Sequence, residues 1–248
     1  MRCRRATFMK KKYITIISLL IFAAFSCNIA KISEATKTAS ANVSNQTTVI
    51  IDAGHGGEDG GAIGKSGSFE KDINLQFALK VNEYLSFLGI NTYMVRTEDR
   101  AIGDNSLPTI RERKVSDIHA RAALMDLFDN SIYLSIHQNE FSENYVHGTQ
   151  VFYAPNSEES KQLASVIQNT VCSLTQPDNT KVPKESGTNI YLLYNATKPA
   201  CLCECGFVSN SEEEKLLLSD DYQRKFSLAL SYSVLNYLIM EENNGTEV

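Results

Sequence analysis

The sequence predicts an α/β fold in which helices cover both faces of a mainly parallel β-sheet. Short apolar segments alternate along the chain with longer segments whose apolar residues recur at helical spacing, and this alternation is typical of parallel sheets. The 248 residues, 43% of them hydrophobic, are enough to build one full core. No repeat, low-complexity block or interior linker divides the sequence, so we expect one domain after an N-terminal leader.

Five short apolar runs are expected to form the strands of this sheet. They span residues 48–52, 90–95, 132–136, 149–153 and 200–205.

The segments between these runs carry helical patterns. In residues 70–88, an apolar stripe recurs at helical spacing from Ile73 to Leu88. Ser68 is expected to cap the start of this helix and Gly89 to end it. The remaining helices are expected at residues 110–128, either continuous or interrupted, and at 157–174, 209–218 and 222–240.

Residues 1–30 have the features of an export signal. A basic region precedes an apolar run from Ile14 to Phe25, which is short for a transmembrane helix but suits a signal peptide. An uncleaved membrane anchor is the second interpretation, and lipoprotein processing at Cys27 is the third. Under each of the three interpretations the body of the chain is exported, and only this N-terminal segment contacts a membrane. Residues 31–47 are polar and rich in small side chains, and we expect a flexible spacer there.

The expected folded domain spans residues 48–240, and the polar residues 241–248 are expected to form a disordered tail. The formal net charge of the whole chain is −5. Without its first twelve residues, which include six basic and no acidic ones, the chain has 18 basic against 29 acidic side chains. A body this acidic argues against nucleic acid as a partner.

Four of the six cysteines lie beyond the leader. Cys201, Cys203 and Cys205 alternate along one expected strand, which places them on one face and Glu204 on the other. A zinc cluster is one interpretation, but Cys-x-Cys-x-Cys on one strand lacks the usual ligand spacing. We therefore expect small buried apolar residues. Free thiols in an exported protein hint at a reducing or anaerobic setting.

Residues that can carry chemistry stand at the carboxyl ends of three expected strands. His55 follows the first strand, His137 follows the third, and Glu204 lies at the end of the fifth. Because the carboxyl ends of parallel strands meet at one edge of a sheet, we expect these side chains to lie together. Glu70 opens the helix that follows the His55 loop. Two imidazoles and one carboxylate are the ligand set of an open, catalytic zinc site.

Each of these residues also has an ordinary interpretation. His55 alone would be a turn histidine, His137 a hydrogen-bonded histidine at the rim, and Glu70 a first-turn carboxylate favoured by the helix dipole. Glu204 would form a salt bridge, or else act as a general base that takes a proton from the attacking water. The functional interpretation is favoured because all four residues are expected at the same edge of the sheet.

Other candidates are weaker. His119 is expected to be solvated in mid-helix, and His147 is a candidate for a supporting or substrate-contacting group. Ser135 and Ser209 lie in no nucleophile motif.

Seven of the 13 glycines lie between Gly54 and Gly67, which calls for positive φ angles or close backbone approach. A phosphate-binding loop is excluded because Asp59 stands where such a loop requires glycine. We expect a loop shaped to place His55 near Glu70.

Five blocks of the sequence resemble one enzyme family, with the similarity running from about Val49 to Leu238. The blocks are Asp52-Ala53-Gly54-His55-Gly56-Gly57, the helix start at Glu70, Thr97 close after Arg96, Ser135-Ile136-His137-Gln138-Asn139, and Glu204-x-Gly206-Phe207-x-Ser209-Asn210. They look like the zinc-dependent N-acetylmuramoyl-L-alanine amidases of the third amidase type.

The resemblance implies hydrolysis of the amide between N-acetylmuramic acid and L-alanine in peptidoglycan. It implies one Zn²⁺ per chain with His55, Glu70 and His137 as ligands, and Glu204 as the catalytic residue. It also implies a zinc-exopeptidase-like three-layer sandwich with a twisted, mostly parallel mixed sheet. A zinc peptidase of the same fold that acts on wall peptides, and a non-catalytic wall-binding protein, are the alternatives.

Two stretches, Arg111 to Arg121 and Asn189 to Leu193, look most like the sporulation and germination branch of this family. That branch acts on spore cortex and leads to muramic-δ-lactam, which implies a place in the cell envelope, a periplasm-like space or the space between the forespore membranes. Lys181 departs from the arginine of many relatives, and Gln138 and Glu140 replace small residues. From the length of the sequence we expect no added wall-binding module, and we expect targeting by the leader, a partner or confinement. An accessory protein that loads metal or substrate is left open.

Overall fold

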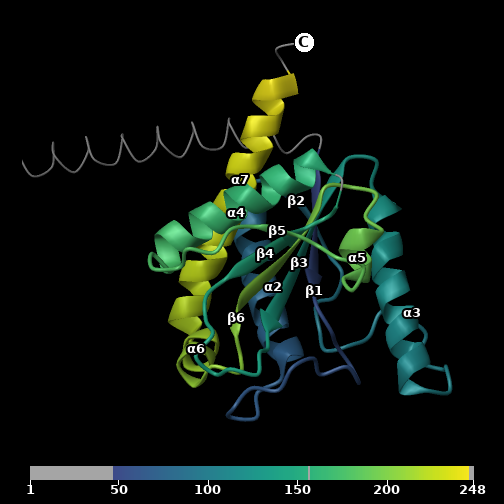
Figure 1. Cartoon of the computed structure of the whole chain (residues 1–248). Helices are drawn as coiled ribbons and strands as arrows, with labels where there is room; N and C mark the ends of the chain where they lie inside the picture. Colours follow the sequence, from purple (N-terminus) through teal and green to yellow (C-terminus); the bar gives the residue numbers. More distant parts are fainter. Residues whose placement is uncertain (1–46, 156, 246–248) are drawn as a thin grey trace, which may run out of the picture. The chain divides into compact units, whose positions relative to one another are not determined.

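The computed structural model describes residues 47–155 and 157–245 (Figure 1). The expected export signal and all but the last residue of the expected spacer lie outside these residues.

A six-stranded mixed sheet forms the middle layer. Its strands are β1 (Thr48–Ala53), β2 (Asn91–Met94), β3 (Ser131–Asn139), β4 (Gln150–Tyr153), β5 (Lys184–Glu185) and β6 (Ala200–Phe207). They lie in the order β2-β1-β3-β6-β4-β5. All neighbouring pairs are parallel except β4 and β6, which run antiparallel. The expected mostly parallel mixed sheet is confirmed.

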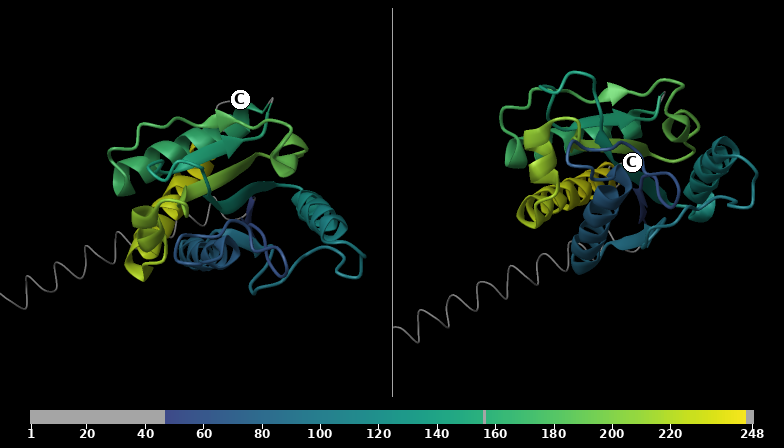
Figure 2. Two further views of the ribbon diagram at one scale, coloured as in Figure 1. Left: turned by 60° about the horizontal axis from the view of Figure 1, so that its bottom comes forward. Right: turned by 90° about the horizontal axis from the view of Figure 1, so that it is seen from below.

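Helices cover both faces of this sheet. They are α2 (Glu70–Phe87), α3 (Ile110–Ala123), the 3-10 helix η1 (Leu124–Leu127), α4 (Glu158–Thr175), α5 (Tyr191–Tyr194), α6 (Ser211–Leu217) and α7 (Asp220–Gly245). One layer contains α2, α4 and α7, and the opposite layer contains α3 and α5 (Figures 1 and 2). The sheet and these two helical layers make up the three layers of the fold.

The central strands are buried on both faces, so their successive side chains enter two separate cores. In β1, Ile51 packs into the core beneath α2, α4 and α7, whereas Ile50 packs into the core beneath α3 and α5. Phe77 of α2 and Phe226 of α7 meet edge to face at 5.4 Å between ring centroids, and both are fully buried. Each buried side chain of this size stabilises the fold by about 1.5–3 kcal/mol.

Three features differ from the expectations. Ser68 does not cap α2, because Phe69 is the N-cap and makes no side-chain cap bond. Helix α7 continues to Gly245, so residues 241–245 are helical. The short elements β5 and α5 were not expected. The helix expected at 110–128, either continuous or interrupted, is interrupted, because α3 ends at Ala123 and the 3-10 helix η1 follows it.

The cysteine prediction is confirmed. Cys201, Cys203 and Cys205 are free and buried in the core beneath α2, α4 and α7, and Cys172 of α4 is also free and buried.

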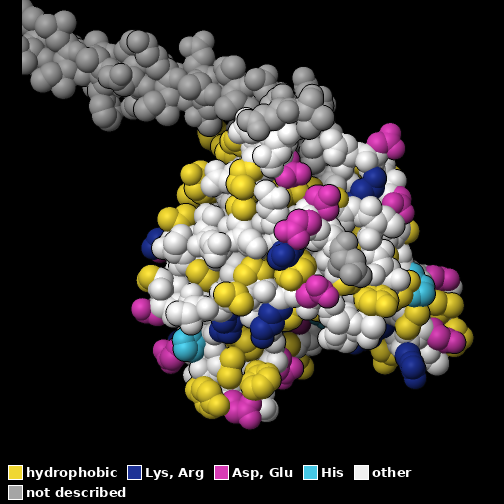
Figure 3. Space-filling view, turned by 45° about the horizontal axis from the view of Figure 1, so that its top comes forward, with side chains coloured by type: hydrophobic (Ala, Val, Ile, Leu, Met, Phe, Trp, Pro, Cys, Tyr) yellow, Lys and Arg dark blue, Asp and Glu magenta, His cyan; other side chains and the backbone are white. Residues whose placement is uncertain are grey.

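On the face drawn in Figure 3, acidic, basic and apolar side chains are interspersed. Among the described helices, none has the length and hydropathy needed to cross a bilayer.

Candidate metal centre

The site lies where the carboxyl ends of β1, β3 and β6 meet. His55 stands two residues beyond the end of β1, and His137 lies within β3, which is longer than expected. His137 is in register with Glu204 on the neighbouring strand β6. Glu70 is the first residue of α2. The topology therefore brings all four residues to one edge, as the sequence predicted.

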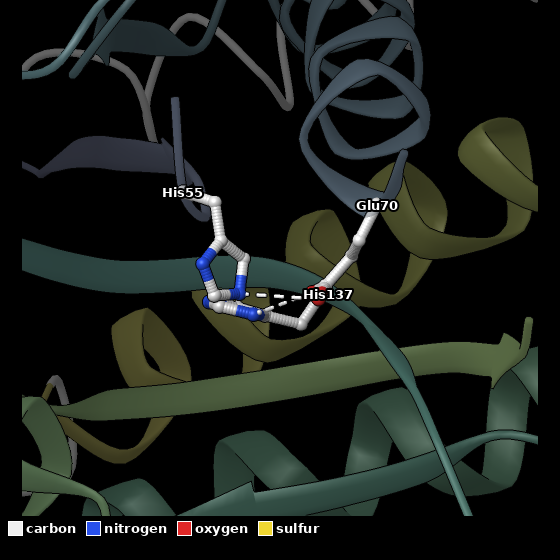
Figure 4. Close-up of side chains that lie close together, drawn as sticks. All are labelled: His55, Glu70 and His137. Carbon is white, nitrogen blue, oxygen red and sulfur yellow. Dashed lines mark hydrogen bonds and ion pairs between the residues drawn. The ribbon is translucent and has the colours of Figure 1, made fainter. Parts of the chain in front are cut away.

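The two imidazoles and the Glu70 carboxylate point toward one another (Figure 4). Glu70 Oε2 lies 3.1 Å from His55 Nε2, and Glu70 Oε1 lies 2.9 Å from His137 Nδ1. One ligand atom from each of the three residues lies within 4.8 Å of the others. This donor set, two nitrogens and one carboxylate oxygen, suits a divalent metal such as zinc.

The glycine-rich loop leaves room for these side chains. A Cβ added to Gly54 would lie 2.1 Å from His137 Nε2, and a Cβ added to Gly61 would lie 2.4 Å from Glu70 Oε2. Gly61 also has a φ of +68°, and His55 itself has a φ of +62°, which is rare outside glycine. The loop is shaped around its functional side chains, as expected.

Hydrogen bonds fix the Glu70 carboxylate from several directions. The backbone N–H of Ala62 donates to Oε2 at 2.8 Å, and the Asn74 amide and the Gln138 backbone N–H each donate to Oε1 at 3.1 Å. Burial by itself would raise the pKa of Glu70. The bonds and charges of His137 and His55 outweigh burial and hold the pKa well below its ordinary value. Glu70 is therefore held in its ionised form, in which a carboxylate can bind a divalent cation.

Asp59 supports His55 from the opposite side. Asp59 Oδ2 lies 2.8 Å from His55 Nδ1, which directs Nε2 of the same ring toward Glu70. Burial works to lower the pKa of His55, but Asp59 and Glu70 outweigh it and raise the pKa to about 10. From the sequence, Asp59 served only to exclude a phosphate-binding loop. Its position four residues after His55 was the signal that could have identified this role.

Buried arginines form the floor beneath the loop. Arg121 of α3 is 3% exposed, pairs with the fully buried Asp52 at the end of β1, and donates to the backbone carbonyl of His55 at 2.6 Å. Arg96 is 1% exposed and donates to the carbonyls of Ala53 and Gly54 at 2.8 and 3.1 Å. Together they hold the backbone at His55 in its unusual conformation.

Glu204 is partly buried and lacks the salt bridge that was its ordinary interpretation. Within the described part of the chain no lysine or arginine pairs with it, and its buried Oε2 has no hydrogen-bond partner. Burial, followed by the charge of Glu70, raises the pKa of Glu204 to about 8, while His55 acts in the opposite direction. A buried carboxylate oxygen without a partner, beside a metal-type donor set, is available for chemistry.

An open pocket joins these residues to solvent. Its lining includes His55, Glu70, His137 and Glu204, together with Asp59 and Lys114.

The other candidates lie outside this pocket. His119 of α3 stacks on Tyr191 of α5 at 4.7 Å between ring centroids, in the helical layer that α3 and α5 form. His147 Nδ1 contacts the carbonyl oxygen of Tyr145 at 3.0 Å. The Lys181 ammonium donates to the carbonyls of His147 and Gly148, so it braces a turn. Ser135 donates to Asp52 at 2.9 Å, as part of the buried floor.

Known proteins match this chain over most of its length. A germination-specific N-acetylmuramoyl-L-alanine amidase of Bacillus subtilis is 33% identical over 189 residues, which are 76% of this chain and 78% of that protein. The structure of the CwlD amidase from Clostridioides difficile, in complex with the GerS lipoprotein, is 33% identical with a TM-score of 0.75 and covers 79% of this chain and 100% of that one. A crystal structure of an N-acetylmuramoyl-L-alanine amidase from Clostridium difficile 630 is 32% identical with a TM-score of 0.68, over 79% of this chain and 98% of that one.

The family model described as N-acetylmuramoyl-L-alanine amidase, Amidase_3, matches residues 49–236. This range contains all four residues of the site and all six strands except for Thr48, the first residue of β1. The chain therefore belongs to the Amidase_3 family of N-acetylmuramoyl-L-alanine amidases.

Proposed function

We propose that this protein hydrolyses the amide between N-acetylmuramic acid and L-alanine in peptidoglycan, with zinc held by His55, Glu70 and His137 and with Glu204 as general base. The observation that carries the proposal is the unpartnered Glu204 oxygen beside an open His₂Glu donor set. Membership of the Amidase_3 family supports both the reaction and the metal.

The side chains divide the work. A zinc ion bound by these three residues would polarise the amide carbonyl and acidify water. A divalent cation held by these residues would also offset the charge of Glu70 and so favour the ionised form of Glu204. The ionised Glu204 carboxylate takes a proton from the attacking water and delivers it to the departing alanine amine. Asp59 holds the His55 ring, while Ala62, Asn74 and Gln138 hold the Glu70 carboxylate. The products are a lactyl carboxylate on the sugar and a free N-terminal alanine on the peptide.

Purified protein incubated with wall or cortex sacculi tests the reaction. N-terminal alanine should appear, and EDTA should prevent its release. The variant Glu204→Gln should keep zinc, measured by metal analysis, while losing almost all activity. Full activity in this variant would refute the general-base role. Cleavage of sugar-free wall peptides in preference to muramoyl peptides would instead favour a zinc peptidase.

Spore cortex is the peptidoglycan form that we propose as the substrate. The relatives named as germination-specific amidase and as CwlD are each 33% identical to this chain. Mass spectrometry of cortex muropeptides from cells with and without the protein should detect muramic-δ-lactam only when the protein is present. Equal amounts of lactam in both samples would place the substrate elsewhere.

We also propose that this protein is exported and that it works together with an accessory protein. The C. difficile CwlD amidase was solved with the GerS lipoprotein, which makes a lipoprotein partner a reasonable expectation. Zinc content and activity of the purified chain, measured before and after addition of a co-purifying partner, would test whether the partner loads metal.

A further inference from the structure

Lys114 of α3 is the single lysine or arginine among the described residues that line the site pocket. The other charged side chains there include the carboxylates Asp59, Glu70, Glu140 and Glu204. The carboxylates repel an anionic peptide, and Lys114 is the lysine or arginine side chain of this pocket that can attract a carboxylate. The stem peptides of peptidoglycan carry carboxylates, so a cation at this place has a natural target.

The ammonium group of Lys114 is held but accessible. Its Nζ lies 2.7 Å from Asp59 Oδ1, and 51% of its side chain is exposed. Asp59 uses its other oxygen for His55. Lys114 is thus anchored toward the site through one carboxylate, and the remaining N–H donors of an ammonium can bind a second acceptor.

The spacing agrees with a substrate contact close to the cleaved bond. The path from the Lys114 ammonium to His55 Nε2 consists of the contact with Asp59, the Asp59 carboxylate, its contact with His55 Nδ1, and the imidazole ring. The ammonium charge therefore lies on the order of 10 Å or less from His55 Nε2. In an extended peptide, the residue after alanine lies within about 7 Å of the cleaved amide. A carboxylate on that residue can therefore reach Lys114 while the amide lies beside Glu204.

We propose that Lys114 is a specificity-determining residue that binds the α-carboxylate of the stem-peptide residue following L-alanine. This inference rests on the proposed amidase function. A charge-assisted hydrogen bond at a half-exposed position corresponds to about a tenfold effect on kcat/KM.

Two synthetic muramoyl peptides test the proposal. They are identical except that the residue after L-alanine is D-glutamate with a free α-carboxylate in one, and D-isoglutamine, its α-carboxamide, in the other. Lys114→Met should raise KM for the carboxylate peptide about tenfold and leave KM for the carboxamide peptide unchanged. Lys114→Arg should restore most of the preference, because it keeps the positive charge.

A matched control comes from α4. Lys161 is 53% exposed and pairs with Glu158 at 3.3 Å, and α4 contributes no residue to the pocket. Lys161→Met should leave both peptides unaffected. Zinc affinity of each variant, measured by competition with a chromogenic chelator, reports any effect that passes through Asp59 and His55.

The outcomes distinguish an error in the role of Lys114 from an error in the amidase function. An equal loss of kcat/KM on both peptides, with weaker zinc binding, would show that Lys114 only braces Asp59 and would overturn the inference. Unchanged kinetics in Lys114→Met would overturn it as well. Failure of the unmodified protein, supplied with zinc and its co-purifying partner, to cleave either peptide or sacculi would instead overturn the amidase function, and the inference with it.

Discussion

Gly54 lies against the ring of His137 so closely that any Cβ at position 54 would sit 2.1 Å from Nε2 of that ring. Real Cβ contacts are never this short, and the obstructing atoms belong to a ring held by Glu70 at 2.9 Å. The glycine is thus part of the site although it offers no functional group. Its role is to let β1 and β3 present two imidazoles in one small volume.

Gly54→Ala should therefore displace His137 and weaken zinc binding by at least tenfold, with a matching loss of amidase activity. The fold should survive, because the clash is with a side chain at the pocket. Competition with a chelator measures the zinc affinity, and circular dichroism checks that the fold survives. Gly67→Ala is the control, since a Cβ there meets nothing within 4 Å. Its φ of +89° costs roughly 1–2 kcal/mol of stability but should leave zinc affinity intact.

Asp59→Ala should lower zinc affinity about 10- to 100-fold, because the His55 ring loses the partner that orients it. Asp59→Asn should recover part of this loss, since an amide oxygen can still accept from Nδ1. The adjacent Glu58 is the matched control, because its carboxylate pairs with Arg113 at 2.7 Å and Glu58 does not line the pocket. Glu58→Ala with the same loss as Asp59→Ala would contradict the assignment.

The four central residues of the site were predictable because each stands beside a strong local pattern. His55, His137 and Glu204 each stand at or near the end of an apolar run, and Glu70 begins an amphipathic stripe. In a parallel sheet these local positions converge without further information. The register between β3 and β6, which pairs His137 with Glu204, is a tertiary detail that the sequence did not predict.

Long-range contacts explain what the sequence could not predict. Ser68 stands where a cap is expected, yet its hydroxyl donates to Glu214, 146 residues away, at 2.7 Å. Arg96 and Arg121 are buried, against the usual tendency of arginine, and only the folded chain reveals the carbonyls that satisfy them. Strand β5 has two exposed residues and therefore carries no apolar signal.

The buried pair of Asp52 and Arg121 should make stability depend on pH. Burial works to raise the pKa of Asp52, but Arg121, His137 and Ser135 outweigh it and lower the pKa. A carboxyl whose pKa is lowered by folding stabilises the native state above its unfolded pKa of about 3.9, and this contribution is lost as the pH falls through the folded value.

Asp52→Asn should therefore cost a few kcal/mol at pH 7, near the lower end of the roughly 3–5 kcal/mol for a broken buried pair, because Asp117 still contacts Arg121 at 2.6 Å. Urea unfolding of metal-free protein at pH 7 and at pH 3.5 measures the difference between variant and unmodified protein. The difference should narrow at the lower pH. A gap that is equal at both pH values would show that folding does not lower the pKa of Asp52.

Zinc removal should lower the melting temperature. A ligand at 100 times its dissociation constant stabilises the native state by about 2.7 kcal/mol, which for a domain of this size corresponds to roughly 5–10 °C. His137→Ala should abolish this response to zinc, because the donor set loses one of its three residues. His147→Ala provides the matched control, since His147 lies outside the pocket and should leave the response unchanged. Thermal unfolding with zinc and with EDTA gives all three comparisons, and a zinc response that persists in His137→Ala would place the metal elsewhere.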